Sequence, residues 1–171
     1  TKQVITTTEI STEAAIALSV VSAVCGQQLS AHMHTIITTL SQALTPSENT
    51  EEKSKDDIEV FNLTAAIVMR SVAGVGVSRA VDELGKLIEI SNNTNRKRTG
   101  CILLSHLAAT PTDYTDYLPV MLRFLCGRVC DTSTEVLQAA LTALRALAAN
   151  VRHELFGQHI RFMQSCLVSC V

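Results

Sequence analysis

Residues 112–149, TDYTDYLPVMLRFLCGRVCDTSTEVLQAALTALRALAA, decide the fold, because they predict two amphipathic helices joined by a short turn at Asp131. In the first helix, leucine and methionine recur at spacings of three and four residues, which gathers them on one stripe of a helix. Pro119 falls in its first turn, where no backbone donor is missed. The members of the stripe are Leu118, Met121, Leu122 and Leu125. Because the turn is short, the two helices are expected to lie antiparallel and to pack against each other.

The second helix has its own start signal, the run Thr132-Ser133-Thr134-Glu135, in which Thr and Glu have the spacing of a capping box. This spacing predicts that the helix begins directly after Thr132. Apolar side chains then recur on one predicted face, at Leu137, Ala140, Leu141, Leu144 and Ala148. No pattern in the pair indicates catalysis, so fold and function depend on what the rest of the chain adds.

Composition restricts the possible functions. A chain of 171 residues is long enough for one domain with a substantial core. Hydrophobic residues make up 47% of it but aromatic residues only 4%, which favours close packing of helices by Leu, Ala, Val and Ile. The net charge of -2 encodes no overall attraction to nucleic acid or to a membrane surface. No apolar run approaches the ~18 residues that a membrane span requires.

Helical spacing of apolar residues continues through the rest of the chain. The acidic stretch 46–57 is interpreted as a solvated loop inserted between helices, because residues 47–57 include no apolar side chain. No stretch has the alternation of a strand, so we predict an all-α fold of about eight antiparallel helices. The further helices are predicted at about 11–25, 29–44, 58–72, 77–90, 96–109 and from 155 to the end.

Three of the predicted helices align without gaps and reveal an internal repeat. Their sequences are LSAHMHTIITTL from Leu29, YTDYLPVMLRFL from Tyr114 and FGQHIRFMQSCL from Phe156. Leu118 and Ile160 then hold equivalent positions 42 residues apart, which is the length of a two-helix HEAT or armadillo repeat. We therefore predict a HEAT-type α-solenoid of about four repeats, with the terminal repeats incomplete. The residues expected to define the repeat are Tyr114, Leu118, Leu122, Leu125, Asp131, Leu137 and Leu144.

Residues 1–171 are interpreted as a single solenoid segment of a larger protein, since the chain starts without Met and stops inside an apolar helical pattern. HEAT repeats typically carry Asp at the turn between their two helices and Arg near the start of the second helix. Here Asp131 is followed by Leu137, whereas the preceding repeat has Asn92 and Arg98. Because the two repeats complement each other, we expect Arg98 to lie near the Asp131 turn. The alternative is that both are solvated surface charges.

With this register, residues 28–167 resemble part of the HEAT-repeat general-control translational activator, the large stimulator of the initiation factor 2 alpha kinase. The resemblance rests on Thr112-Asp113-Tyr114, the Asp131 turn with Val136-Leu137, the run Ala143-Leu144-x-Ala146-Leu147 and the stretch VCGQQLSAHMHTIITTLSQAL at 24–44. It implies a non-enzymatic cytoplasmic scaffold that holds the kinase, a partner ATPase and the ribosome together during amino-acid starvation. No matching position implies a kinase-contacting residue.

Signals for catalysis or metal binding are weak. The six cysteines lie in apolar helical stretches and are interpreted as packed thiols of a reducing compartment. Cys126 with Cys130, and Cys166 with Cys170, are each one helical turn apart and could in principle chelate zinc, but structural zinc favours tighter Cys-x2-Cys turns. No His spacing predicts a partner for a catalytic cysteine. We expect no catalytic residue, no metal, no cofactor and no small-molecule substrate.

Basic residues near the predicted helix ends are the candidate binding residues. They are Arg96, Lys97, Arg98, Arg123 and Arg128, with Arg145 and Arg152 as further members. Such a basic ridge could bind RNA phosphates or an acidic protein partner, although a solvated helix terminus is the simpler interpretation. Three functions therefore stay open: a protein-binding scaffold, a segment that contacts the ribosome or RNA directly, and a transport-receptor or phosphatase scaffold built from similar repeats.

Overall fold

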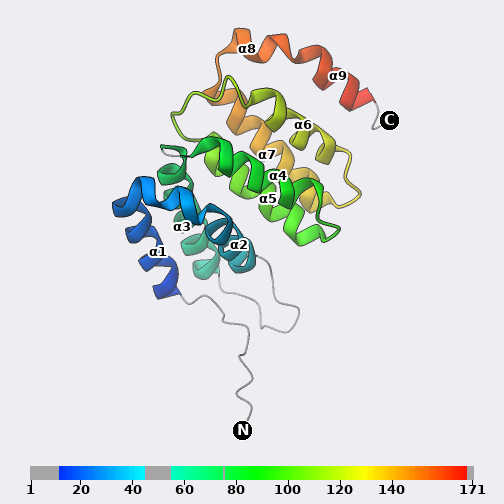
Figure 1. The fold of residues 1–171 in the computed structure, drawn as a ribbon. Coiled ribbons are helices and arrows are strands. Elements are labelled where there is room, and N and C mark those ends of the chain that lie inside the picture. The colour runs from blue at the N-terminus through cyan, green and yellow to red at the C-terminus, as the bar shows by residue number, and fades with distance from the viewer. Residues whose placement is uncertain (1–11, 45–54, 75, 169–171) are drawn as a thin grey trace.

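The structure is a computed structural model that describes residues 12–44, 55–74 and 76–168. Within these ranges the chain forms nine α-helices, one 3-10 helix and no strand, as Figure 1 shows. The prediction of an all-α fold is therefore confirmed. The helix predicted from residue 155 to the end is instead two helices, α8 (His153–Gln158) and α9 (Ile160–Val168). They are separated at His159, whose backbone N–H donates to the Phe156 carbonyl at 3.1 Å in a tight turn.

The helices are arranged in two layers (Figure 1). The first layer contains α1 (Thr12–Cys25), α3 (Lys55–Ala73), α5 (Thr94–Ala108) and α7 (Thr134–Asn150), and the second contains α2 (Met33–Leu44), α4 (Val77–Glu89), α6 (Leu118–Val129) and α9. Each helix packs against the next member of its own layer, and several consecutive pairs, above all α4 with α5 and α6 with α7, also pack across the layers. This stack of helix pairs is the architecture of a HEAT-type α-solenoid, which confirms the predicted fold.

Two helix boundaries differ from the prediction. A 3-10 helix, η1 (Gly26–His32), follows α1, so α2 begins at Met33 rather than at Leu29. The helix α3 begins at Lys55, inside the stretch 46–57 that we predicted to be a loop. Acidic residues near a helix N-terminus are favourable, so the acids at 56 and 57 do not prevent a helix there. The part of the predicted loop before residue 55 lies outside the described residues.

A continuous apolar core lies between the two layers. Leu118, Leu122 and Leu125 of α6 are at most 1% exposed. Burial of each such leucine stabilises the fold by about 1.5–3 kcal/mol relative to an exposed position. The core runs without a break from Leu29 to Leu147, so the repeats share one core rather than each enclosing its own.

The helix α7 buries a different face from the one that its sequence predicted. Leu141 is 47% exposed, and Leu137 and Leu144 are only half-buried. The buried residues are Val136, Ala139, Ala140, Ala143 and Leu147. The physical reason is the neighbour of α7, because alanines on this face let α7 approach α5 closely and leave the longer leucines at the flanks.

The turn before α7 also differs from the predicted capping box. The N-cap residue is Ser133, and its side chain makes no capping hydrogen bond. Asp131 closes the turn instead, because its Oδ1 accepts the backbone N–H of Ser133 at 3.2 Å. The helix therefore begins at Thr134, and the prediction of a capping box at Thr132 is wrong.

Tyr114 fixes the connection between α5 and α6. Its side chain is 2% exposed, and its hydroxyl donates to the carbonyl of Leu107 near the end of α5. The Thr110 hydroxyl donates to the same carbonyl at 2.8 Å and also contacts the Tyr114 hydroxyl. Burial raises the pKa of Tyr114 above its usual value. The Leu107 carbonyl also accepts the backbone N–H of Thr110 at 3.0 Å, so several bonds meet at the C-terminal end of α5.

Gly85 and Gly100 lie where helices approach most closely. A Cβ atom at Gly85 would overlap the ring of Phe124 in α6, and one at Gly100 would lie 2.7 Å from Cγ1 of Ile88 in α4. We expect Gly85→Ala to lower the free energy of unfolding by about 1–3 kcal/mol, because Phe124 is only 5% exposed and has little room to move. Urea unfolding followed by circular dichroism measures this change.

The matched control is Gly127→Ala in α6. A Cβ atom there meets no other atom within 4 Å, so the substitution is expected to raise the free energy of unfolding by about 0.5–1 kcal/mol. If Gly85→Ala and Gly127→Ala shifted stability in the same direction, the close packing of α4 on α6 would be contradicted.

Candidate functional site

Carboxylates hold most of the cations that we predicted as a basic ridge. Arg96, Lys97 and Arg98 lie in the first turns of α5, and Arg123 and Arg128 lie on α6. The ion pairs are Lys97–Asp131 at 3.4 Å, Arg98–Glu135 at 3.5 Å, Arg123–Glu89 at 3.3 Å and Arg128–Asp131 at 3.2 Å. Among the described residues, Arg96 is the only one of the five without an ion pair.

Asp131 joins two successive repeats. Its Oδ2 binds Lys97 of α5 and Arg128 of α6, and its side chain is 9% exposed. Burial acts to raise the pKa of Asp131, but the hydrogen bonds from Ser133 and Lys97 and the nearby charges together lower this pKa. The expected contact between repeats therefore exists, and Arg98 lies near the turn through its pair with Glu135, but the α5 residue that binds Asp131 itself is Lys97. Lys97 and Arg98 point about 100° apart around the helix, so only one of them reaches Asp131.

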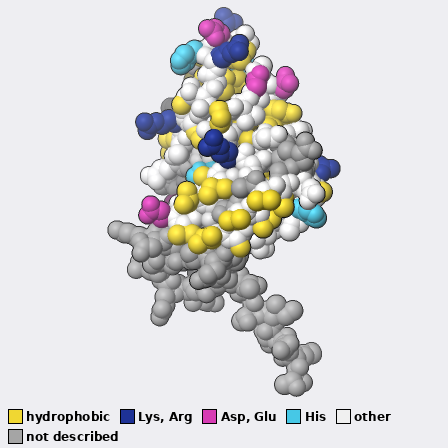
Figure 2. All heavy atoms as spheres, turned by 90° about the vertical axis from the view of Figure 1, so that its left-hand side faces the viewer, with side chains coloured by type: hydrophobic (Ala, Val, Ile, Leu, Met, Phe, Trp, Pro, Cys, Tyr) yellow, Lys and Arg dark blue, Asp and Glu magenta, His cyan; other side chains and the backbone are white. Residues whose placement is uncertain are grey.

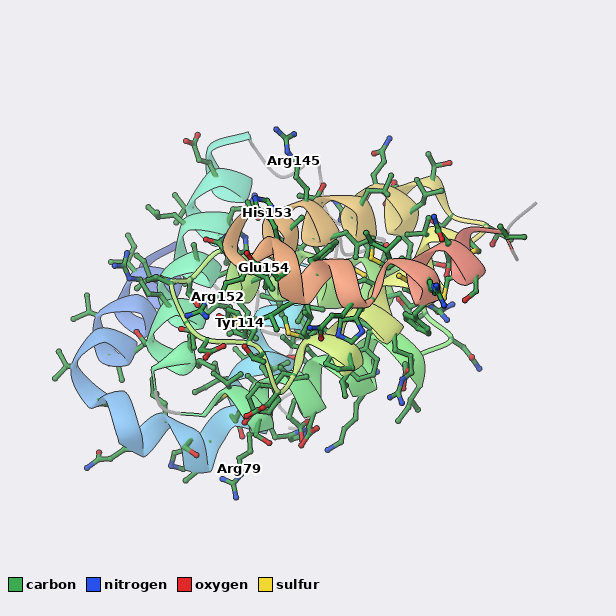
Figure 3. The ribbon with its side chains drawn as sticks, turned by 90° about the horizontal axis from the view of Figure 1, so that it is seen from above. Arg79, Tyr114, Arg145, Arg152, His153 and Glu154 are labelled. Atoms are coloured by element: carbon green, nitrogen blue, oxygen red, sulfur yellow. The ribbon has the colours of Figure 1, made fainter. Side chains whose placement is uncertain are left out.

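Two further members of the predicted ridge, Arg145 and Arg152, lie on α7 and directly before α8. Figure 3 shows Arg145 extending outward on one side of the array, whereas Arg79, which is not one of the predicted cations, extends outward on the opposite side. The figure places Arg152, His153 and Glu154 together around the start of α8. Cations in these positions alternate with carboxylates and face different directions, which is a poor match to the continuous charge of a nucleic-acid backbone.

A groove of about 440 Å³ lies between α2 and α4 and ends at the turn before α5. Ile37 and Leu87 supply apolar surface, and Ile90 stands beside them with 74% of its surface exposed. Lys86 and Arg96 are the cations of this groove, which we call the α2–α4 groove. It therefore combines an exposed aliphatic side chain with positive charge.

Hydrogen bonds occupy the single carboxylate of this groove. Glu83 accepts from His34 Nδ1 at 2.7 Å and from Lys86 Nζ at 2.6 Å. The bonds from His34 and then Lys86 lower the pKa of Glu83. At the other end of the groove, the Asn93 side chain accepts the backbone N–H of Arg96 at 3.1 Å. Asn93 thereby caps α5 and fixes where this helix begins. The Arg96 guanidinium makes no ion pair with another residue in the described part of the chain.

A second groove, of about 560 Å³, lies on the surface of the first layer between α5 and α7. Asn62 of α3 also lines it, and we call it the α5–α7 groove. His106 contributes to its wall, and Nε2 of this ring is buried with no hydrogen-bond partner among the described residues. Burial lowers the pKa of His106.

Sequence reasoning found Arg96 but missed His34, Glu83 and Ile90 as its neighbours. His34 and Glu83 are 49 residues apart and come from different repeats, so no local spacing links them. Ile90 was placed in a helix, where it lies beyond the buried stripe of α4. The sequence signal for this groove was the position of Ile90, an apolar residue outside the buried stripe of α4 and next to a turn rich in Asn.

The described cysteines differ in burial and in bonding. Cys101 and Cys126 are buried, and burial raises the pKa of the Cys101 thiol to about 12 and that of Cys126 to about 11. Such thiols are poor nucleophiles at neutral pH. Cys130 is exposed and disulfide-bonded, so the interpretation of every cysteine as a packed thiol is wrong for this residue. Cys170 lies outside the described residues.

The part of the chain that the structure describes contains neither a metal-binding cluster nor a membrane-spanning helix. No group of three or more His, Cys, Asp or Glu side chains there is placed to hold a metal ion. None of the described helices is long and apolar enough to cross a membrane.

Exposed apolar side chains gather on α1, at one end of the array. Figure 2 shows this end of the molecule, with apolar side chains clustered on it. Ile16, Val20 and Val24 are 52%, 58% and 79% exposed and follow one another at a spacing of four residues. Within the described residues α1 packs against α3 and η1, and these three side chains lie at the surface.

The Asp131 contact makes a testable contribution to stability. We expect Asp131→Asn to lower the free energy of unfolding by about 1.5–3 kcal/mol, because it removes two charge-assisted hydrogen bonds at a side chain that is 9% exposed. Glu135→Gln is the control and should cost less than about 1 kcal/mol, since Glu135 is 66% exposed. Equal losses in urea unfolding would show that Asp131 has no special role.

His106 makes stability depend on pH. Its pKa in the folded chain is below the usual value of 6.5, so the unfolded chain binds the proton more readily. The free energy of unfolding should therefore fall as the pH drops from about 7.5 through about 6.5 toward the folded pKa. His106→Gln should flatten this part of the profile, because it removes the buried titratable ring. A profile that His106→Gln does not alter would contradict the burial of a neutral ring.

Comparison with known families agrees with the two-layer array. A family model described as "Stalled ribosome sensor GCN1-like, HEAT repeats" matches residues 3–171. A search of curated proteins finds no match. The family match covers almost the whole chain and confirms the resemblance that the repeat residues suggested. The chain belongs to the HEAT-repeat family of GCN1-like stalled ribosome sensors.

Proposed function

We propose that this chain is a non-enzymatic scaffold that binds proteins during the sensing of stalled ribosomes in the cytoplasm. The α2–α4 groove carries this proposal, because it joins an exposed isoleucine to an arginine that makes no ion pair with another described residue, at the junction of two repeats. Solenoid proteins bind partners along surfaces that successive repeats create together. A groove of this kind belongs to no single repeat and exists only in the assembled array.

The chemistry of the α2–α4 groove fits an acidic segment that also carries an apolar side chain. Ile90 is 74% exposed and gains from burial under an apolar group of a partner. Arg96 lies at the same end of the groove and can pair with a carboxylate of that partner. Glu83 adds little repulsion, because His34 and Lys86 already share its charge. The proposed partner surface is therefore an acidic amphipathic one.

The family resemblance suggests which protein supplies this segment. Its members are expected to hold an initiation factor 2 alpha kinase, a partner ATPase and the ribosome, and we propose that the kinase's N-terminal domain occupies the α2–α4 groove. The chain would act as one part of a longer array in that assembly. Direct RNA contact through the predicted ridge has weaker support, because Lys97, Arg98, Arg123 and Arg128 are paired with carboxylates. The family match gives no support to a transport-receptor or phosphatase scaffold.

Two substitutions test the proposal. Arg96→Glu and Ile90→Ser each alter an exposed side chain of the groove, so both variants should fold normally. Each is expected to weaken binding of the chain to the purified kinase N-terminal domain by about tenfold or more, measured by calorimetry. Arg161→Glu, an exposed charge reversal on α9, is the matched control and should bind as the unmodified chain does.

Unchanged affinity in both groove variants would overturn the assignment of this groove. Direct contact with RNA, the alternative function, is distinguished by a different measurement. Binding to ribosomal RNA that weakens steeply with salt, and is lost when Arg96 and Arg98 are both replaced by Glu, would favour direct RNA contact.

A further inference from the structure

The α5–α7 groove has unused hydrogen-bonding capacity that the proposed function does not explain. It lies on the first layer, whereas the α2–α4 groove lies on the second, so the two surfaces belong to different faces of the array. Ile102 and Ala139 supply its apolar surface. The remaining lining is polar, which makes it a candidate for recognition by hydrogen bonds.

The two hydroxyls of this groove, those of Ser105 and Thr142, both donate their hydrogen bonds to backbone carbonyls. Ser105 Oγ donates to the Ile102 carbonyl at 2.7 Å, and Thr142 Oγ1 donates to the Gln138 carbonyl at 2.8 Å. A hydroxyl has one proton and two lone pairs, so each oxygen can still accept a hydrogen bond. A ligand that binds beside these two hydroxyls can therefore donate N–H or O–H groups to their oxygens.

Two side-chain amides flank these hydroxyls. Asn62 projects from α3 and Gln138 from α7, and neither amide has a hydrogen-bond partner in the described part of the chain. Each amide offers one acceptor and two donors, the same groups that a backbone peptide unit pairs with. The amides of Asn62 and Gln138 can therefore pair with both the N–H groups and the C=O groups of an extended polypeptide backbone.

The groove carries no net charge. Its only charged residues are Arg98 and Glu135, which pair at 3.5 Å. The unpartnered Nε2 of His106 adds a neutral polar atom to the same lining. A strongly charged ligand would thus find no uncompensated charge here, in contrast to the α2–α4 groove.

The length of the groove also limits its ligand. Its α5 residues extend from Arg98 to His106 and its α7 residues from Glu135 to Thr142. At about 1.5 Å per residue these stretches are roughly 10–12 Å long. An extended peptide advances about 3.3 Å per residue, so roughly three or four residues fit.

We propose that the α5–α7 groove binds a short, uncharged, extended segment of a second protein partner, and that Asn62 and Gln138 recognise its backbone amide groups. The segment lies along α5 and α7, with its N–H groups directed at the Ser105 and Thr142 oxygens. The scaffold then has two separate binding faces with different chemistry, one for an acidic amphipathic partner and one for an uncharged extended chain.

Selection of short random peptides displayed on phage tests this proposal on the full chain. Peptides that bind the unmodified chain are counter-selected against a variant carrying Asn62→Ala and Gln138→Ala. Gln138 is exposed and Asn62 is half-buried on the surface, so this variant should keep the circular dichroism spectrum of the parent. The expected products are uncharged peptides that lose about tenfold or more in affinity on the double substitution and change little with salt.

Methylation of single backbone nitrogens then separates backbone recognition from side-chain recognition. We expect one or two central N-methyl groups to abolish binding, because each removes an N–H donor. Gln158→Ala on α8, outside the groove, is the matched control and should leave affinity unchanged. Selection of only acidic peptides, binding that survives the double substitution, or indifference to N-methylation would each overturn the proposal.

Discussion

Close approach of neighbouring helices through small side chains is the constraint on which the array depends. Gly85 leaves space for the Phe124 ring, Gly100 leaves space for Ile88, and α7, which buries Ala140 and Ala143, packs closely against α5. Packed interiors transmit a change of one methyl group to their neighbours, so these positions set the spacing and rotation of successive repeats. The spacing of the repeats therefore determines the width of the surface grooves. A groove between repeats is therefore a property of the core as much as of the residues that line it.

Ion pairs between repeats act on top of this packing and determine which charges remain for partners. His34–Glu83, Arg98–Glu135 and Arg123–Glu89 each link consecutive repeats at exposed positions, where such pairs contribute little stability. Their larger effect is on surface chemistry, because they neutralise side chains that would otherwise form a basic surface. Arg96 keeps its charge, and it lies next to exposed Ile90. Charge pairing thus converts a predicted basic ridge into a local groove with mixed polar and apolar character.

Periodicity predicted the features that depend on neighbours along the chain. The buried face of α6, with Leu118 and Leu125, and the all-α repeat follow from the spacing of apolar residues alone. The face of α7 did not, because Leu141 and Ala143 are both apolar and only the proximity of α5 decides which is buried. The carboxylates that pair with the predicted ridge cations depend on helix rotation, which local spacing does not specify. Lys97 rather than Arg98 therefore meets Asp131. The groove around Arg96 joins residues of two repeats, and no pattern within one repeat contains that information.

Hydrogen–deuterium exchange of the chain, alone and with the kinase N-terminal domain, tests most directly the claim that the α2–α4 groove is a protein-binding surface. Binding there predicts slower exchange at residues 33–38 of α2 and at residues 86–96, which include the turn before α5. Residues 128–134, around the paired Asp131, should exchange as they do in the free chain. Protection confined to the Asp131 turn, or absent from both regions while the complex is shown to form, would contradict the account.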